Sequence, residues 1–178
     1  MTKMLSTIVG IQTAVQAGDT IGNTAVATNF ASTATLPANA FRAASRYFYV
    51  DAWGLFSTDL GPIPVHTLKI DLMSDAAVLA TTGAFNTTLA GAVADPWHLH
   101  ADVTCDTTGA GGTVEAQGIS FWQNTIVAAD IVFLPNAAAV AFNTTTAHVI
   151  QLRATWTAAS VNNTITLREF IVGISGAA

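Results

Sequence analysis

The sequence predicts an all-β protein, built as an antiparallel β-sandwich of about eight strands. Apolar and polar residues alternate with a period of two in several segments, and Gly, Pro and Asn clusters separate these segments. No stretch after residue 18 keeps the 3.6-residue period of an amphipathic helix. Without helices to connect parallel strands, neighbouring strands are expected to run antiparallel.

The strongest strand signals lie in four segments: HTLKIDLM from residue 66, WHLHADVTC from residue 97, HVIQLRATW from residue 148 and NTITLREFIVGI from residue 163. In the last segment, the apolar positions shift from odd to even numbers near Arg168 and Glu169. A β-bulge there would explain the shift, because one extra residue moves the following side chains into the other phase. The apolar positions of the four segments predict a core that includes Leu68, Ile70, Leu72, Leu99, Val103, Leu152, Trp156 and Leu167.

Less regular segments supply the remaining strands. We expect them at about residues 20–30, 46–57, 76–81, 113–122 and 130–134, which gives eight or nine strands in all. No linker and no repeat of fixed period divides the chain. The predicted organisation is an N-terminal arm or short helix at residues 1–18, followed by one sandwich domain at residues 19–178.

Composition predicts that this domain is a subunit of a larger assembly. Charged residues make up 10% of the 178-residue chain, against roughly 25% in an ordinary domain, while Ala (33) and Thr (26) are abundant. The hydrophobic fraction of 51% indicates that partners cover much of the outside. Two Lys and four Arg are scattered in a chain of net charge −5, so no nucleic-acid partner is expected.

Targeting and membrane segments are not expected either. No apolar run approaches the roughly 18 residues that a membrane-spanning helix needs. The first 18 residues contain a short apolar stretch, but Thr and Gln interrupt it and no A-x-A cleavage site follows. A signal peptide is therefore not predicted.

The two histidines of WHLHADVTC are the main candidates for a metal site. His98 and His100 lie two residues apart, so their side chains leave a strand on the same side, and Asp102 could join them as a third ligand. The cupin pattern requires a Glu four or five positions after the second histidine, where this chain has Thr104 and Cys105. We expect no bound metal and no cofactor, and interpret both histidines as exposed or in contact with another subunit.

No catalytic constellation is apparent elsewhere. The single cysteine, Cys105, occupies an apolar position of its strand, which favours a small buried residue over a nucleophile. The glycines of Gly109–Gly112 lack the Lys-Ser/Thr pair and the helix of a phosphate-binding loop, so they predict a hairpin turn. There is no G-x-S-x-G motif and no recognisable carboxylate pair. We assign no catalytic residues and expect no enzymatic activity.

Five blocks of the chain resemble a family of structural proteins from tailed bacteriophages and prophages. They span about residues 20–172 and read GNTAVATNFASTATLPANAF, RYFYVDAWGLFST, PVHTLKIDLM, WHLHADVTCDTTGAGGTVEAQG and ATWTAASVNNTITLREFIV. The most specific pieces are LPANAF, TCDTTGAGGTV and the closing WTAASVNNTITL. The resemblance implies a jelly-roll-like β-sandwich in a virion, often trimeric and without enzymatic activity.

The short chain favours a capsid decoration, or cement, protein within this family, because fibres usually add a long shaft to their head domain. Such a homotrimer would sit on the capsid surface over junctions between major capsid proteins. One alternative is a tail or head-fibre tip protein that binds a host surface glycan, and another is a small metal-dependent, cupin-like enzyme. The apolar residues of the N-terminal arm are the candidate assembly contacts: Met4, Leu5, Ile8, Val9 and Ile11.

Overall fold

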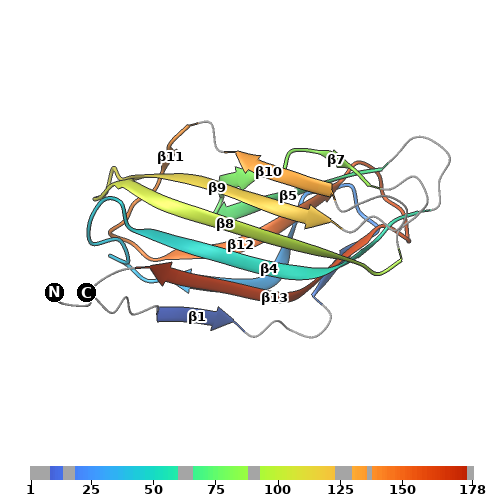
Figure 1. Ribbon diagram of the computed structural model, residues 1–178, viewed down its shortest axis with the longest axis horizontal. Coiled ribbons are helices and arrows are strands. Elements are labelled where there is room, and N and C mark those ends of the chain that lie inside the picture. Colours follow the sequence, from blue (N-terminus) through green and yellow to red (C-terminus); the bar gives the residue numbers. More distant parts are fainter. Residues whose placement is uncertain are drawn as a thin grey trace.

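The computed structural model describes residues 9–13, 19–59, 66–87, 93–122, 130–135 and 138–175. Within these ranges the protein is an all-β sandwich of two sheets, and every strand pair is antiparallel (Figure 1). The fold class predicted from the sequence is therefore confirmed. No helix in this part of the chain has the length and apolar character to cross a membrane.

The larger sheet, sheet A, contains eight strands among the described residues. Its order is β1 (Val9–Thr13), β13 (Thr164–Ser175), β4 (Tyr47–Ser57), β8 (Asp95–Thr107), β9 (Thr113–Trp122) and β10 (Asp130–Pro135), with β2 (Thr20–Gly22) beside β13 and β11 (Val140–Ala141) beside β9. The smaller sheet, sheet B, has the order β3 (Thr28–Leu36), β12 (His148–Trp156), β5 (Thr67–Ser74) and β6 (Ala77–Thr81), with β7 (Phe85–Asn86) beside β5.

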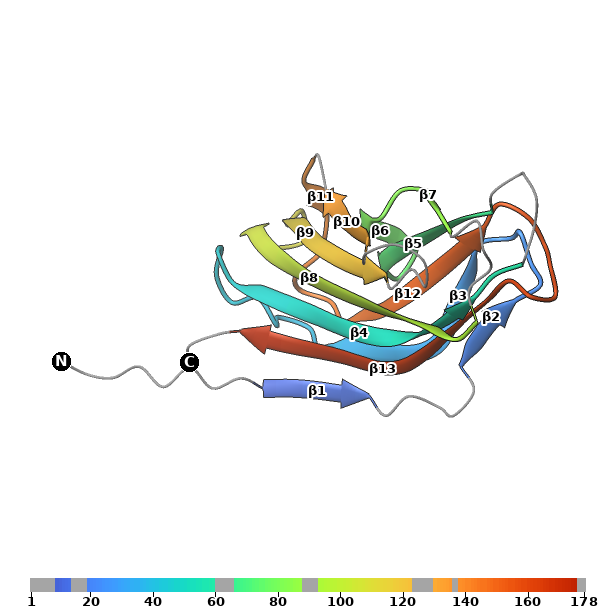
Figure 2. The same ribbon diagram turned by 45° about the vertical axis from the view of Figure 1, so that its right-hand side comes forward.

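The chain crosses repeatedly between the sheets. Strands β3, β4 and β5 alternate between sheet B and sheet A, and β12 and β13 do the same, which gives the sandwich its jelly-roll-like character (Figure 2). Strands β8, β9 and β10 instead follow one another as neighbours in sheet A.

The core lies between the sheets and follows the period-two pattern. All eight core residues predicted from the sequence are buried, with exposed fractions of 0–1%. Aromatic residues fill the space near one end of the core, where the Trp97 and Trp122 rings stack with centroids 6.0 Å apart and Phe56 meets Trp122 edge-on at 5.1 Å. This packing fixes β4, β8 and β9 relative to one another.

Two local predictions have definite outcomes. The β-bulge expected near Arg168 is present, because the pairing of β13 with β4 shifts register between Leu167 and Glu169. The single strand expected at about residues 20–30 is divided into β2 and β3. Asn23, which follows β2, has a φ of +50°, a left-handed conformation that interrupts an extended strand.

Residues 9–13 of the predicted arm or short helix form β1. This strand pairs antiparallel with β13, with Val9 opposite Ile174 and Ile11 opposite Val172. The rest of residues 1–18 lies outside the described residues, and so do the candidate contacts Met4, Leu5 and Ile8.

Candidate functional site

The glycine cluster forms the hairpin turn between β8 and β9, as predicted. Gly109 has a φ of +108°, which favours glycine, and the N–H of Gly112 donates to the Gly109 carbonyl at 3.1 Å. A Cβ on Gly112 would come within 2.6 Å of the Phe142 carbonyl oxygen. The Thr144 hydroxyl accepts a 2.8 Å hydrogen bond from the Gly109 N–H. The turn thus contacts the loop between β11 and β12, and backbone groups of the turn form hydrogen bonds with that loop.

The other two specific pieces of the resemblance, LPANAF and WTAASVNNTITL, also contain residues that pack loops onto the fold. In LPANAF, Phe41 is buried, and its ring contacts Phe48 and Phe142 at centroid distances of 5.9 and 5.8 Å. In SVNNT, the fully buried Asn163 donates through Nδ2 to the Ala158 carbonyl at 3.2 Å. These residues hold the fold together, so the most specific pieces of the resemblance mark structure and not chemistry.

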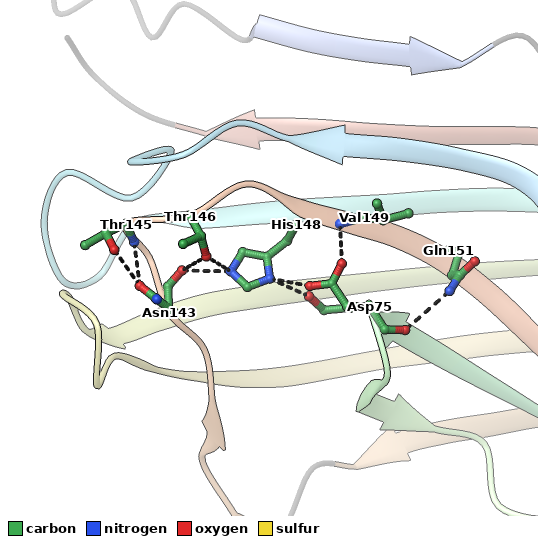
Figure 3. Close-up of polar contacts among 8 residues, drawn as sticks. Asp75, Asn143, Thr145, Thr146, His148, Val149 and Gln151 are labelled. Carbon is green, nitrogen blue, oxygen red and sulfur yellow. Dashed lines mark hydrogen bonds and ion pairs between the residues drawn. The ribbon is translucent and has the colours of Figure 1, made fainter.

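A polar cluster surrounds His148, at the start of β12. His148 Nδ1 lies 2.7 Å from the Asp75 carboxylate, and Nε2 lies 2.7 Å from the Asn143 carbonyl oxygen (Figure 3). Asp75 also accepts a 2.9 Å hydrogen bond from the Val149 N–H, while the side-chain oxygen of Asn143 caps the Thr145 N–H at 3.0 Å. The cluster joins the β5–β6 turn to the β11–β12 loop, so its role is structural.

His98 and His100 face away from the core, as predicted, and meet a carboxylate that the sequence reasoning missed. Asp51 on β4 pairs in register with His100. Its Oδ1 accepts from His98 Nε2 at 2.6 Å, and its Oδ2 accepts from His100 Nδ1 at 3.3 Å. Asp51 therefore accepts one hydrogen bond from each imidazole. The arrangement fixes two imidazoles on the sheet surface.

Asp102 lies beside His100 on β8. Its Oδ1 is 3.7 Å from His100 Nε2, an ion-pair distance beyond a normal hydrogen bond. No group of three or more His, Cys, Asp or Glu side chains among the described residues is arranged to hold a metal ion. The expectation of no bound metal stays a prediction.

Aromatic side chains surround the two histidines on the outer surface of sheet A. His98 stacks on Phe121 and His100 stacks on Tyr49, each with ring centroids 6.3 Å apart. Trp53, directly opposite His98 in register, is 42% exposed, and its indole N–H donates to Glu169. We call this surface the histidine face and define it by Tyr49, Asp51, Trp53, His98, His100, Ile119, Phe121, Phe133 and Glu169.

An open cleft of about 460 Å³ adjoins His100 at the β10 side of the histidine face. Phe133, which is 70% exposed, and Ile119 form its apolar part. The polar part consists of His100, Asp102 and Gln117, and the remaining lining comes from Gly118 and Leu134. The cleft has the size and the mixed lining of a small-ligand site.

A second exposed apolar surface lies at the end of the sandwich where β4 ends and β13 begins. Val26 in the β2–β3 loop, Val93 before β8 and Val161 in the β12–β13 loop are 72%, 81% and 74% exposed. Figures 1 and 2 place these loops at the same end, and the Asn23 N–H donates to the Asn163 carbonyl at 3.1 Å. We call this end, with Val26, Val93 and Val161, the valine end.

The valine end is nearly free of charge. A shallow cleft of about 420 Å³ between Val93 and Val161 is lined by hydroxyl and amide side chains, with Asp59 as its single charged residue. Sequence reasoning missed this surface, because the three valines are 67 and 68 positions apart and only the fold brings their loops to one end.

Cys105 is buried in the core, as predicted. Burial raises the pKa of its thiol, and the negative charge of the adjacent Asp106 raises that pKa further. A thiol that stays protonated at neutral pH is a poor nucleophile, which agrees with a packing role.

Comparisons with known proteins identify no family. No family model and no curated protein sequence matches the chain. One solved structure, the CBM2 module of the evolved Dit of Lactobacillus casei BL23 phage J-1, aligns with 82% of this chain and 69% of its own, with a TM-score of 0.37 and 9% sequence identity. This likeness is too low to transfer a function, so the proposals below are based on the residues of this chain.

Proposed function

We propose that the chain is a non-enzymatic structural protein of a bacteriophage virion, and specifically a capsid decoration protein that attaches through its valine end to the major capsid protein. The virion assignment is supported by the resemblance of the sequence blocks to phage structural proteins. The observation that carries the attachment is that three separate loops present strongly exposed valines at one end of the sandwich.

Physical chemistry favours attachment by apolar burial. Burying a valine side chain completely contributes roughly 1.5–3 kcal/mol, so three valines on one subunit provide a useful part of a binding free energy. The described loops of the valine end offer Asp59 as their one charged side chain, which leaves little scope for ion pairs. In a homotrimer, three such ends would bind together and gain avidity from their linkage.

The N-terminal segment is the second proposed contact. Met4, Leu5 and Ile8 precede β1 in the sequence, and an apolar segment at a sheet edge can extend onto a neighbouring subunit. A truncation that lacks residues 2–8 keeps all of β1 and removes these three residues. We expect this truncation to fold as the full chain does and to bind particles more weakly.

Co-sedimentation with undecorated capsids tests the proposal. Full-length protein should sediment with the particles equally at low and high salt, since apolar contacts are not screened by ions. Replacement of Val26, Val93 and Val161 together by Ser should abolish sedimentation. The matched control is Val149→Ser, because Val149 is also exposed but lies on β12. This variant should bind particles as the unaltered protein does.

Two outcomes contradict the proposal. Release of full-length protein by moderate salt would rule out apolar attachment, and unchanged binding of the triple valine variant would rule out the valine end as the contact. Attachment to tails or fibres, with no binding to capsids, would instead support the alternative of a fibre-tip protein that binds a host glycan.

A further inference from the structure

The histidine face combines flat apolar rings with fixed hydrogen-bonding groups. Trp53 and Phe133 are exposed, and both lie on the surface that faces away from sheet B. Asp51 lies two residues from Trp53 on β4, and its row in register runs across β8 and β9, through His100 and Ile119, to Phe133 on β10. The carboxylate therefore shares this face with two exposed rings, one beside it on β4 and one three strands away on β10.

The polar groups of this face keep hydrogen-bonding capacity. A carboxylate has about four acceptor positions, and His98 and His100 occupy one on each oxygen of Asp51. Gln117 lines the adjacent cleft and makes no side-chain hydrogen bond to another described residue. An amide can both donate and accept. A ligand rich in hydroxyl groups would satisfy these positions.

The charge of the face selects among such ligands. Among the described residues that form this face and line its cleft, Asp51, Asp102 and Glu169 carry carboxylates, and none is Lys or Arg. Anionic ligands such as uronic acids, sialic acids and phosphates would meet like charges, which weaken binding.

We propose that the histidine face of sheet A is a binding site for neutral saccharides. A pyranose ring has a C–H face that packs on an aromatic ring and hydroxyl groups that both donate and accept hydrogen bonds. The cleft of about 460 Å³ beside His100 would hold one sugar unit, and Trp53 would provide a stacking surface for another. This site is separate from the valine end, so its existence does not depend on attachment to a capsid.

Direct titration tests the proposal. The purified chain is titrated with hexasaccharides of glucose, mannose, galactose and N-acetylglucosamine, and with hexagalacturonate as the anionic counterpart, by calorimetry and tryptophan fluorescence. At least one neutral hexasaccharide should bind and hexagalacturonate should not. Trp53→Ala and Phe133→Ala should each weaken binding by about tenfold, as expected for loss of an aromatic stacking partner.

Controls separate a binding role from a folding role. Trp53 and Phe133 are exposed, so both variants should unfold at the temperature of the original protein. Gln117→Leu should weaken binding without a change in unfolding, while Val161→Ala, at the valine end, should bind saccharide normally. Trp53→Ala should still co-sediment with capsids, which keeps this test distinct from that of the decoration role.

Three results would overturn the proposal. The first is that no neutral hexasaccharide binds at millimolar concentration, and the second is that hexagalacturonate binds equally well. The third is that Trp53→Ala or Phe133→Ala dissociates an oligomer of the protein in light scattering, since the histidine face would then be a contact between subunits.

Discussion

The ring of Tyr49 on β4 lies directly over Gly173 on β13. The two residues pair in register, and a Cβ at position 173 would come within 2.2 Å of the tyrosine ring. Gly173 thereby lets Tyr49 lie flat on the sheet, where it stacks on His100. A glycine in β13 thus shapes the histidine face, although it makes no side-chain contact of its own.

Two glycine substitutions should therefore differ in their effect on stability. In Gly173→Ala the obstacle is the outer end of a half-buried side chain, which can rotate away, so we expect a loss of under about 1 kcal/mol. In Gly54→Ala the new Cβ would lie 1.8 Å from the Thr166 carbonyl oxygen, which belongs to the backbone. That clash should cost about 3 kcal/mol or more.

Chemical denaturation of the two variants measures both stability losses. Losses of comparable size would contradict the expected difference between Gly173→Ala and Gly54→Ala. In addition, Gly173→Ala should alter the near-ultraviolet circular dichroism of the aromatic residues, since Tyr49 must leave its stacked position. An unchanged aromatic spectrum would mean that the ring does not depend on the glycine.

Asp71 should make the stability of the protein sensitive to acid. Burial alone would raise the pKa of the Asp71 carboxyl, but hydrogen bonds from Arg153, Thr81 and Lys69, with the Lys69 charge, outweigh burial and hold that pKa below its ordinary value of 3.8. Arg153 donates from Nε at 3.0 Å and from Nη2 at 2.6 Å. The resulting stabilisation is complete above the pKa of the unfolded chain and is lost as pH falls toward the folded pKa.

Asp71→Asn removes this charge at every pH. At pH 7 we expect the variant to lose about 1–3 kcal/mol of unfolding free energy, because Arg153 and Lys69 lose their carboxylate partner. The difference from the original protein should narrow below about pH 4. A difference in unfolding free energy that stays constant from pH 7 to pH 3 would contradict the lowered pKa of Asp71. Asp102→Asn, on the outer surface, serves as the control.

His98 and His100 should bind no structural metal. Asp51 accepts hydrogen bonds from Nε2 of His98 and Nδ1 of His100, and no group of three or more His, Cys, Asp or Glu side chains among the described residues is arranged to hold a metal ion. Elemental analysis of protein purified without chelators should find zinc, nickel and iron far below one atom per chain. Stoichiometric metal that is lost in His98→Ala would contradict this prediction and revive a metal-dependent role.

The purified chain should be a trimer. Its charge-poor composition and exposed apolar surfaces favour burial between copies, and the resemblance to phage structural proteins implies threefold assembly. Light scattering at micromolar concentration should give three times the chain mass. A stable monomer under these conditions would contradict the prediction.

The core could be predicted from the sequence because burial in a sandwich depends on local alternation. Leu68 and Leu152 are both buried, and each has a polar residue on either side along its strand. Side chains alternate between the two faces of a strand, so this pattern alone identifies the buried face. The bulge at Arg168 was visible for the same reason, since it shifts the phase of that alternation. Such signals are carried by a few adjacent residues.

The candidate sites depend on long-range pairing, which no local pattern reveals. Asp51 joins His98 and His100 because β4 and β8 are neighbours in register, although 47 residues separate Asp51 from His98. The requirement for glycine at position 54 arises in the same way, from the carbonyl of Thr166 on another strand. Sequence reasoning found the histidines but could not find the carboxylate that holds them.

An electron cryomicroscopy reconstruction of particles produced from the genome that encodes the chain tests the central claim most directly. We expect density for the sandwich on the outer surface of the capsid, over junctions between major capsid proteins, with Val26, Val93 and Val161 against the shell. Density for the sandwich at the tail or on a fibre, or on the capsid with the valine end directed to solvent, would contradict it.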